Sequence, residues 1–198
     1  MSVAGVLLAA GNGSRLGQPK ALVELAGSTL AERGVALLRG GGASPVIVVS
    51  GAVPVEIPGV VAVHNPEWET GMGSSLATGL RALVSGDASA AVIALADQPL
   101  VGAESVRRLI AAHETGAAVA VAAYDGKPRN PVLIAREHWP AVLELATGDT
   151  GARPFLRAHQ DLVTLVECAD TGRPDDVDTQ EDLARVRSEA TARSIESF

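Results

Sequence analysis

A glycine-rich segment near the N-terminus carries the strongest chemical signal in the sequence. Residues 8–20 have the sequence LAAGNGSRLGQPK, with glycine at positions 11, 13 and 17. Glycine lets backbone N–H groups approach a phosphate closely and form a concave anion site. Arg15 and Lys20 are the only charged side chains before Glu24, in a chain whose formal net charge is −7. Two cations among these glycines favour a triphosphate-binding loop over a plain flexible loop.

Two well-known nucleotide-binding loops fit this segment less well. The dinucleotide fingerprint needs G-x-G-x-x-G and an acidic residue about 20 positions further on. Here the third glycine comes one position late, and the second apolar run ends in Ser50-Gly51 without an acid. A P-loop needs Ser or Thr directly after its lysine, whereas Ala21 follows Lys20. These mismatches count against a dehydrogenase and against a P-loop NTPase.

Two aspartates at element boundaries are candidate metal ligands. Asp97 directly follows an apolar run at 91–96, and Asp178 directly precedes a helical pattern. The carboxyl ends of parallel strands are where α/β sheets bind ligands, and Mg²⁺ takes one or two carboxylates together with substrate phosphates. Asp97 also fits a turn before Pro99, and Asp178 with Glu181 also fits a helix N-cap. Position alone leaves both pairs of roles open.

The elements that must hold these side chains follow from hydropathy. Short, continuous apolar runs predict buried strands, and they alternate with helical patterns, as in a mostly parallel α/β sheet. The runs lie at 3–8, 46–49, 60–63, 91–96, 119–123, 131–134 and 162–166. Thr29 and Glu32 form a capping box that starts one helix, and further helices are expected around 76–84, 106–113, 143 and 183–186. We expect one domain at 1–190 and a frayed tail at 191–198.

Composition restricts the class of protein. The chain has 198 residues, of which 47% are hydrophobic, which suits one globular domain. Its acidic balance argues against a nucleic-acid partner. Cys168 is the single cysteine, so no internal disulfide is possible and a reducing compartment is expected. The first apolar run is too short to span a bilayer and lacks a preceding basic region. We therefore expect a cytoplasmic protein without a membrane anchor. The four histidines lack zinc-site spacing.

Six segments, in order along the chain, resemble the nucleotidyltransferases that act on molybdenum cofactor, and most closely the molybdenum cofactor cytidylyltransferase group. They are AAGNGSRLGQPK at 9–20, NPEWETGMGSSLATGL at 65–80, ADQP at 96–99, NPVL at 130–133, GDTGAR at 148–153 and DVDTQEDL at 176–183. Two departures stand out. Gln180 replaces a usual proline, and Asn130 directly follows Arg129, where relatives often have glycine and then His or Asn before the proline.

The resemblance implies a Rossmann-like nucleotidyltransferase fold with three layers and a mostly parallel sheet. It also implies transfer of CMP from CTP to the terminal phosphate of a molybdopterin-type cofactor, with release of pyrophosphate and a need for Mg²⁺. Catalytic roles fall on Arg15, Lys20 and Asp97, and metal binding on Asp97 and Asp178. The implied acceptor-binding residues are Asn130, Asp149 and Arg153. The implied nucleotide-binding residues are Leu8, Ala9, Ala10, Gly11, Gly13, Arg15, Lys20, Ser75 and Gly79.

Several alternatives stay open at this stage. The same fold accommodates a guanylyltransferase using GTP, another NTP transferase with a different phosphorylated acceptor, or a non-catalytic carrier that delivers the cofactor to a molybdoenzyme. The sequence Ala9-Ala10-Gly11 favours the cytidylyl group, because the guanylyl group tends to have two glycines there. Ser75 could also cap a helix, and Arg153 could pair with Asp149 at the surface.

Overall fold

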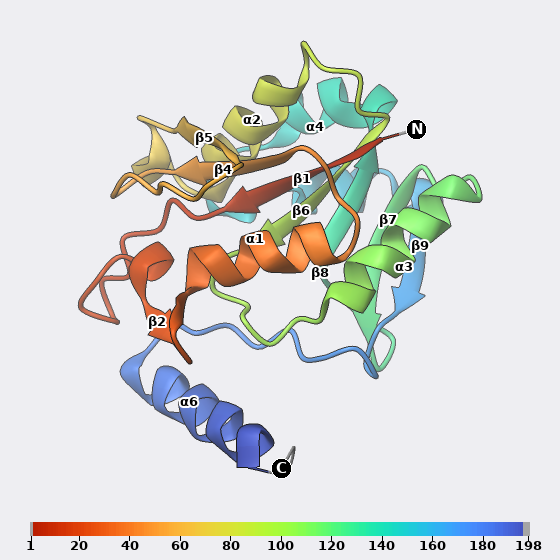
Figure 1. Cartoon of the computed structure of the whole chain (residues 1–198). Helices are drawn as coiled ribbons and strands as arrows, with labels where there is room; N and C mark the ends of the chain where they lie inside the picture. Colours follow the sequence, from red (N-terminus) through yellow and green to blue (C-terminus); the bar gives the residue numbers. More distant parts are fainter. Residues whose placement is uncertain (1, 196–198) are drawn as a thin grey trace.

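Seven strands form the central sheet of the computed structural model, which describes residues 2–195 (Figure 1). Their order across the sheet is β5-β4-β1-β6-β8-β7-β9, and only β8 runs antiparallel to its neighbours. The single α/β domain with a mostly parallel sheet is thereby confirmed. The strands are β1 Val3–Leu8, β4 Val46–Ser50, β5 Val61–His64, β6 Ala90–Leu95, β7 Val119–Tyr124, β8 Lys127–Ala135 and β9 Val163–Glu167.

Each predicted apolar run overlaps one of these strands, and the runs at 60–63, 91–96 and 162–166 are each offset from their strand by one residue. β8 begins four residues before the predicted run because its first residues, 127–130, are polar or exposed and carry no apolar signal. Burial on both faces holds for β1, β4, β6 and β7, whose residues are almost all buried. It does not hold for β5 and β9, which lie at the two edges of the sheet and are largely exposed.

Helices cover both faces of the sheet. α1 (Leu30–Gly40) and α3 (Ala103–Glu114) lie on the face toward the viewer in Figure 1, and α2 (Met72–Leu83) and α4 (Trp139–Leu145) lie on the opposite face. The capping box of Thr29 and Glu32 is present at the start of α1. The short helix α5 (Arg153–Ala158) and the small hairpin of β2 (Glu24–Leu25) and β3 (Ser28–Thr29) were not predicted, because neither is long enough to show a period.

The last helix packs beside the N-terminal loop. α6 (Gln180–Ile195) lies next to the β2–β3 hairpin (Figure 1), and Leu183 and Val186 join a small core with Leu16, Val23 and Leu25. The helix extends past the predicted boundary at 190. The remainder of the predicted frayed tail, 196–198, lies outside the described residues.

Strand β1 links the two main cores and sets the position of the site. Leu7 packs toward α1 and α3, whereas Val6 and Leu8 pack toward α2. At the carboxyl end of β1, Leu8 stands in register with Leu95 of β6. The segments that follow these two strands therefore start side by side, which brings the glycine loop next to Asp97.

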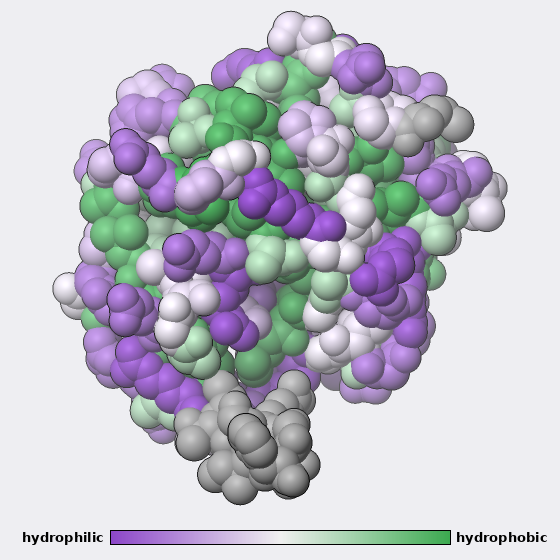
Figure 2. Space-filling view, viewed as in Figure 1, coloured by the Kyte–Doolittle hydropathy of each residue, from purple (hydrophilic) through white to green (hydrophobic). Residues whose placement is uncertain are grey.

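The outer surface of the α1 and α3 layer is mixed in character. Figure 2 shows hydrophilic side chains spread over this face, interrupted by smaller hydrophobic areas. Among the described helices, none combines the length and apolarity needed to cross a membrane.

Cys168 makes stability sensitive to alkaline pH. Its side chain is fully buried after β9, and burial raises the pKa of the thiol to about 11 from an ordinary 9.0. Between these values the unfolded chain loses this proton while the folded chain keeps it, so stability falls as pH rises. We expect a loss of about 2 kcal/mol between pH 8 and pH 11. Urea titrations of wild type and Cys168→Ala should show this loss only in wild type. Equal slopes against pH in both proteins would contradict it.

Candidate active site

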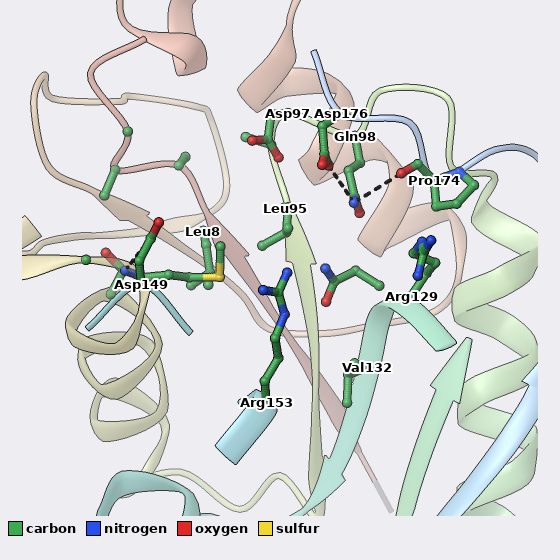
Figure 3. A pocket seen from close by; sticks show the side chains of 18 of the residues that line it. Leu8, Leu95, Asp97, Gln98, Arg129, Val132, Asp149, Arg153, Pro174 and Asp176 are labelled. Atoms are coloured by element: carbon green, nitrogen blue, oxygen red, sulfur yellow. Dashed lines mark hydrogen bonds between the residues drawn. The ribbon is translucent and has the colours of Figure 1, made fainter. Parts of the chain in front are cut away.

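A cleft of about 1470 Å³ opens at the carboxyl edge of the sheet (Figure 3). The glycine loop, the segment after β6 and the chain at 174–178 form one end of it. The start of α2, the start of β8 and helix α5 complete its lining. Most of the residues that the sequence singled out line this one cleft.

The glycine loop folds back on itself to present its cations. Leu16 N donates to Gly13 O at 2.8 Å, and Gly13 has a φ of 61°. A Cβ at this position would lie 2.0 Å from Gln18 O, so no other residue fits this turn. The chain then enters a short 3₁₀ turn at Lys20–Leu22, which is anchored by the buried Ala21. Arg15 and Lys20 thus reach the same end of the cleft.

Lys20 lies at the centre of this end. Its Nζ donates to Asp97 Oδ2 at 2.6 Å and also contacts Asp178 Oδ1, while Arg15 lies 3.3 Å from the other oxygen of Asp178. The side chains of Lys20 and Asp97 are each only 21% exposed. The structure therefore brings together four residues that are separated by up to 163 positions, as the phosphate-site hypothesis requires.

The charges at this end depend on one another. Burial lowers the pKa of Lys20, but attraction to Asp97 and Asp178 outweighs burial, and the pKa rises overall. Burial raises the pKa of Asp97, and Lys20 offsets part of that rise. The hydrogen bond from Lys20 lowers the pKa of Asp178. Lys20 is therefore fully charged at neutral pH, and it holds together two carboxylates that would otherwise repel each other.

The closing segment is fixed to the strand edge by a residue that sequence reasoning passed over. The Gln98 side chain, 6% exposed, donates from Nε2 to Asp176 Oδ1 at 2.8 Å and to Pro174 O at 3.3 Å (Figure 3). Val177 N donates to Asp97 O at 2.8 Å. Gln98 belongs to the ADQP segment, but no spacing rule reveals that it reaches a segment 76 positions away.

The start of α6 differs from the N-cap considered for Asp178 and Glu181. Thr179 is the capping residue: its Oγ1 accepts from Asp182 N at 3.2 Å, and Asp182 Oδ2 accepts from Thr179 N at 3.0 Å. The Asp178 carboxylate is consequently left to face the cleft. Gln180, which departs from the family pattern, donates from Nε2 to Leu16 O at 2.5 Å and ties α6 to the glycine loop.

The predicted nucleotide-binding residues fall mostly along the cleft. Ser75 lines it, and its Oγ accepts from the buried Asn65 Nδ2 at 3.1 Å, so its role is not to cap α2. Gly13 lines a smaller adjoining hollow of about 230 Å³ together with Arg15 and Lys20. Residues that line the main cleft directly are Leu8, Ala9, Ala10 and Gly11.

Gly79 is the exception. It lies in α2 outside the cleft lining, and a Cβ there would lie 2.5 Å from Val6 Cγ1 and 3.0 Å from Val49 Cγ2. This position gives no support to a nucleotide-binding role for Gly79, which stays a prediction. The glycine instead allows α2 to approach β1 and β4 closely.

Gly79→Ala should therefore destabilise the fold without weakening nucleotide binding. Overpacking of this kind costs about 1–3 kcal/mol. Chemical denaturation would measure this loss, and titration with CTP and Mg²⁺ would give an unchanged Kd. Gly86→Ala is the matched control, because its Cβ would lie 3.5 Å from Leu83 O, an ordinary contact. A weaker Kd with unchanged stability would support the nucleotide-binding role.

The predicted acceptor residues Asn130, Asp149 and Arg153 all line the cleft. Asp149 and Arg153 do not form the surface ion pair that the sequence allowed. Asp149 Oδ1 instead accepts from Met72 N, at 3.3 Å, at the start of α2. Arg153 comes from α5 and points toward the middle of the cleft (Figure 3).

The donor set suits a divalent cation. Within residues 2–195 no three His, Cys, Asp or Glu side chains are grouped to hold a metal. Asp97 and Asp178 nevertheless converge on one ammonium group, which stands in for a cation between two carboxylates. Mg²⁺ takes one or two carboxylates and completes its octahedron with water and phosphate oxygens. The pair fits such a metal when a nucleotide supplies further oxygens.

Known proteins resemble this chain over half of its length or more. A family model described as MobA-like NTP transferase domain matches residues 5–163. The nicotine blue oxidoreductase of Paenarthrobacter nicotinovorans is 38% identical, over 93% of this chain and 96% of the relative. A molybdenum cofactor guanylyltransferase of Xanthomonas euvesicatoria is 39% identical, over 54% of this chain and 53% of the relative.

Solved structures agree with this match. Rv0371c from Mycobacterium tuberculosis superposes with a TM-score of 0.80 and 26% identity, over 95% of this chain and 98% of that one. A complex of the same protein with manganese has a TM-score of 0.77. The family match, the shared fold and the cleft that gathers Arg15, Lys20, Asp97 and Asp178 lead to one conclusion: the chain belongs to the MobA-like NTP transferase family of nucleotidyltransferases.

Proposed function

We propose that this protein transfers CMP from CTP to the terminal phosphate of a molybdopterin-type molybdenum cofactor and releases pyrophosphate. The observation that carries the proposal is Lys20, which contacts both Asp97 and Asp178 beside the glycine loop. The AAG sequence at 9–11 favours CTP over GTP. The single cysteine suits action in the cytoplasm, and a molybdoenzyme would receive the product.

In the proposed reaction an oxygen of the acceptor phosphate attacks the α-phosphorus of CTP. A new P–O bond forms while the bond from that phosphorus to the bridging oxygen of the β-phosphate breaks, and pyrophosphate leaves. The second pKa of a phosphate monoester is about 6, so the attacking group is already ionised at neutral pH. No general base is needed. The main barrier is the repulsion between the two anions.

The residues of the glycine loop reduce that repulsion. Arg15 suits bidentate phosphate contacts and Lys20 acts as a compact charge, while the backbone of residues 9–13 supplies N–H groups. Mg²⁺ held by Asp97 and Asp178 would neutralise charge on the departing pyrophosphate. When the nucleotide binds, Asp97 and Asp178 would therefore either give up their contacts with Lys20 in favour of a metal, or contact Lys20 and the metal together.

Turnover with CTP, GTP, ATP and UTP tests the base assignment. Pyrophosphate release should be fastest with CTP when Mg²⁺ and the phosphorylated pterin acceptor are present. The Xanthomonas relative makes GTP the chief competitor. Faster release with GTP would replace the assignment by a guanylyltransferase. Equal rates with all four nucleotides would refute base selection altogether.

An oxidoreductase is the second candidate, because a relative 38% identical over almost the whole chain carries that name. The absence of an acid after β4, where Ser50-Gly51 ends the strand, counts against a dinucleotide site. An assay of NADH and NADPH oxidation in the presence of nicotine blue decides between the oxidoreductase and the nucleotidyltransferase. Turnover there, with no pyrophosphate release from any NTP, would favour the oxidoreductase.

A further inference from the structure

A side chain of α6 holds the glycine loop from outside the cleft. Gln180 donates from Nε2 to Leu16 O at 2.5 Å, across 164 positions of sequence. A carbonyl oxygen can only accept, so the NH₂ group of the side-chain amide must face Leu16. In the described structure neither Leu16 nor Gln180 lines the main cleft or the smaller hollow beside it. A phosphate or a metal in the cleft would therefore leave this hydrogen bond intact.

Leu16 is a firm attachment point for Gln180. Leu16 N donates to Gly13 O at 2.8 Å, which closes the turn of the loop. The Leu16 side chain is 2% exposed and packs in the same small core as Leu183 of α6. Backbone and side chain are thus both fixed at this position, directly after Arg15 in the sequence. The hydrogen bond from Gln180 consequently helps to set how far the loop cations lie from the start of α6.

The contacts between the glycine loop and the chain around Asp178 are of two kinds. Two are ionic: Arg15 lies 3.3 Å from Asp178 Oδ2, and Lys20 Nζ contacts Asp178 Oδ1. These three side chains line the cleft, so triphosphate oxygens would compete for both cations and a metal would compete for the carboxylate. The hydrogen bond from Gln180 to Leu16 is neutral and uses none of these groups. It can persist while the ionic contacts are exchanged.

Asp178 stands between two anchors of the backbone. Val177 N donates to Asp97 O at 2.8 Å and holds the chain before Asp178 beside the end of β6. Two positions after Asp178, Gln180 holds the chain to Leu16 of the glycine loop. The first anchor fixes Asp178 relative to the strand end that carries Asp97, and the second fixes it relative to the loop that carries the cations. A metal that joins Asp178 to phosphates in the loop depends on the second anchor.

We propose that Gln180 is a positioning residue for the metal site. It keeps the Asp178 carboxylate within reach of the glycine loop while Arg15 and Lys20 bind the triphosphate. The inference rests on the proposed function for the use of a divalent metal at Asp178 and of a triphosphate at the loop. The device is particular to this chain, because Gln180 replaces a usual proline of the family pattern and proline has no side-chain donor.

Inorganic tripolyphosphate is the probe, since it presents the phosphate chain without a base or an acceptor. Calorimetric titrations in EDTA and in Mg²⁺ give the gain in affinity that the metal provides. In wild type this gain should be at least about tenfold, the value of one charge-assisted contact. Gln180→Met keeps the length of the side chain and removes the donor, so the gain should shrink about fivefold to tenfold. Binding in EDTA should stay within about twofold of wild type, because Leu16 keeps its own turn and its core packing.

A second variant and a matched control make the result specific. Gln180→Pro also lacks the donor, and proline is tolerated at the first position of a helix, which Gln180 occupies in α6. Arg187→Met is the control, because Arg187 donates to Glu24 O at 3.0 Å from the same helix and its loss tests a general loosening of α6. The gain from Mg²⁺ should shrink in Gln180→Pro and stay unchanged in Arg187→Met. Equal losses with and without Mg²⁺, or the same loss of gain in Arg187→Met, would overturn the proposal.

A double variant shows whether Gln180 acts through Asp178. Asp178→Asn should itself reduce the gain from Mg²⁺. Adding Gln180→Met to Asp178→Asn should reduce the gain no further, because the carboxylate that Gln180 positions is already gone. If Gln180→Met has the same effect with and without the Asp178 carboxylate, the positioning role is refuted.

Pyrophosphate release from CTP, measured separately, keeps this test apart from the proposed function. If the tripolyphosphate titrations behave as described while CTP does not react, CMP transfer falls and the positioning role stands. If CTP turns over but Gln180→Met keeps the full gain from Mg²⁺, the positioning role falls and the transfer stands. A wild-type protein that gains no affinity from Mg²⁺ would also overturn the positioning role.

Discussion

Replacing Lys20 by methionine should lower the rate of pyrophosphate release by about 10³-fold, the upper range for losing one group that stabilises developing charge in a transition state. Lys20 is the only side chain that contacts both Asp97 and Asp178 in the described structure. Methionine keeps an unbranched side chain only one atom shorter and removes the charge. Stopped assays of pyrophosphate release at saturating CTP and acceptor would measure the effect.

Lys127→Met is the matched control. The chain has only two lysines, and Lys127 lies exposed at the start of β8, outside the cleft lining. It should turn over within a factor of about two of wild type, because surface substitutions rarely change more than the local solvation. Similar activity in both variants would mean that the glycine loop does not hold the triphosphate.

The pH profile of Lys20→Met gives a second readout. Asp97 has to be ionised to hold a metal, and burial already raises its pKa while Lys20 offsets part of the rise. Activity should therefore fall as pH drops through that pKa. Without Lys20 the pKa of Asp97 rises further, so the acidic limb of the profile should move to higher pH. An unmoved limb would show that another group controls it.

The sequence predicted the architecture well where apolar runs are long. β1, β4, β6 and β7 are buried along their whole length, so continuous hydrophobicity locates them. Short elements were not predicted. α5 has six residues and no apolar period, so it was not predicted. The placement of Arg153 and Arg157 on one face of this helix was not predicted either. An R-x-x-x-R spacing was the available signal.

The candidate site, too, could be predicted only in part. Arg15 and Lys20 were singled out as the two cations of the glycine loop. Asp97 and Asp178 were singled out because they stand at a strand end and before a helix, where α/β folds place ligands. Their mutual contacts span as many as 163 positions, and no spacing rule encodes such a distance. Gln98, which fixes the closing segment, was missed for this reason. The packing role of Gly79 was not predicted, because a glycine for close helix packing and a glycine for a ligand look alike in sequence.

Asp97→Asn should lower turnover by about 10²- to 10³-fold and raise the Mg²⁺ concentration needed for half-maximal rate. Asparagine keeps the shape of the side chain and removes its charge. The fold should tolerate the change, because burial disfavours the Asp97 charge, and Lys20 retains Asp178 as a partner. Rates measured across a Mg²⁺ titration, with urea unfolding alongside, separate lost chemistry from lost stability. Unchanged pyrophosphate release would favour a non-catalytic carrier of the cofactor.

Asp176→Asn is the control that makes this result interpretable. Asp176 lines the same end of the cleft and stands two positions before Asp178, but its carboxylate accepts from Gln98 rather than from Lys20. It raises the pKa of Asp97, so its removal should make Asp97 a slightly better anion. Turnover should then stay within about tenfold of wild type, since a hydrogen bond of this kind contributes about 1 kcal/mol. Equal losses in Asp176→Asn and Asp97→Asn would mean that total negative charge matters at this edge, and that Asp97 has no specific place beside the metal.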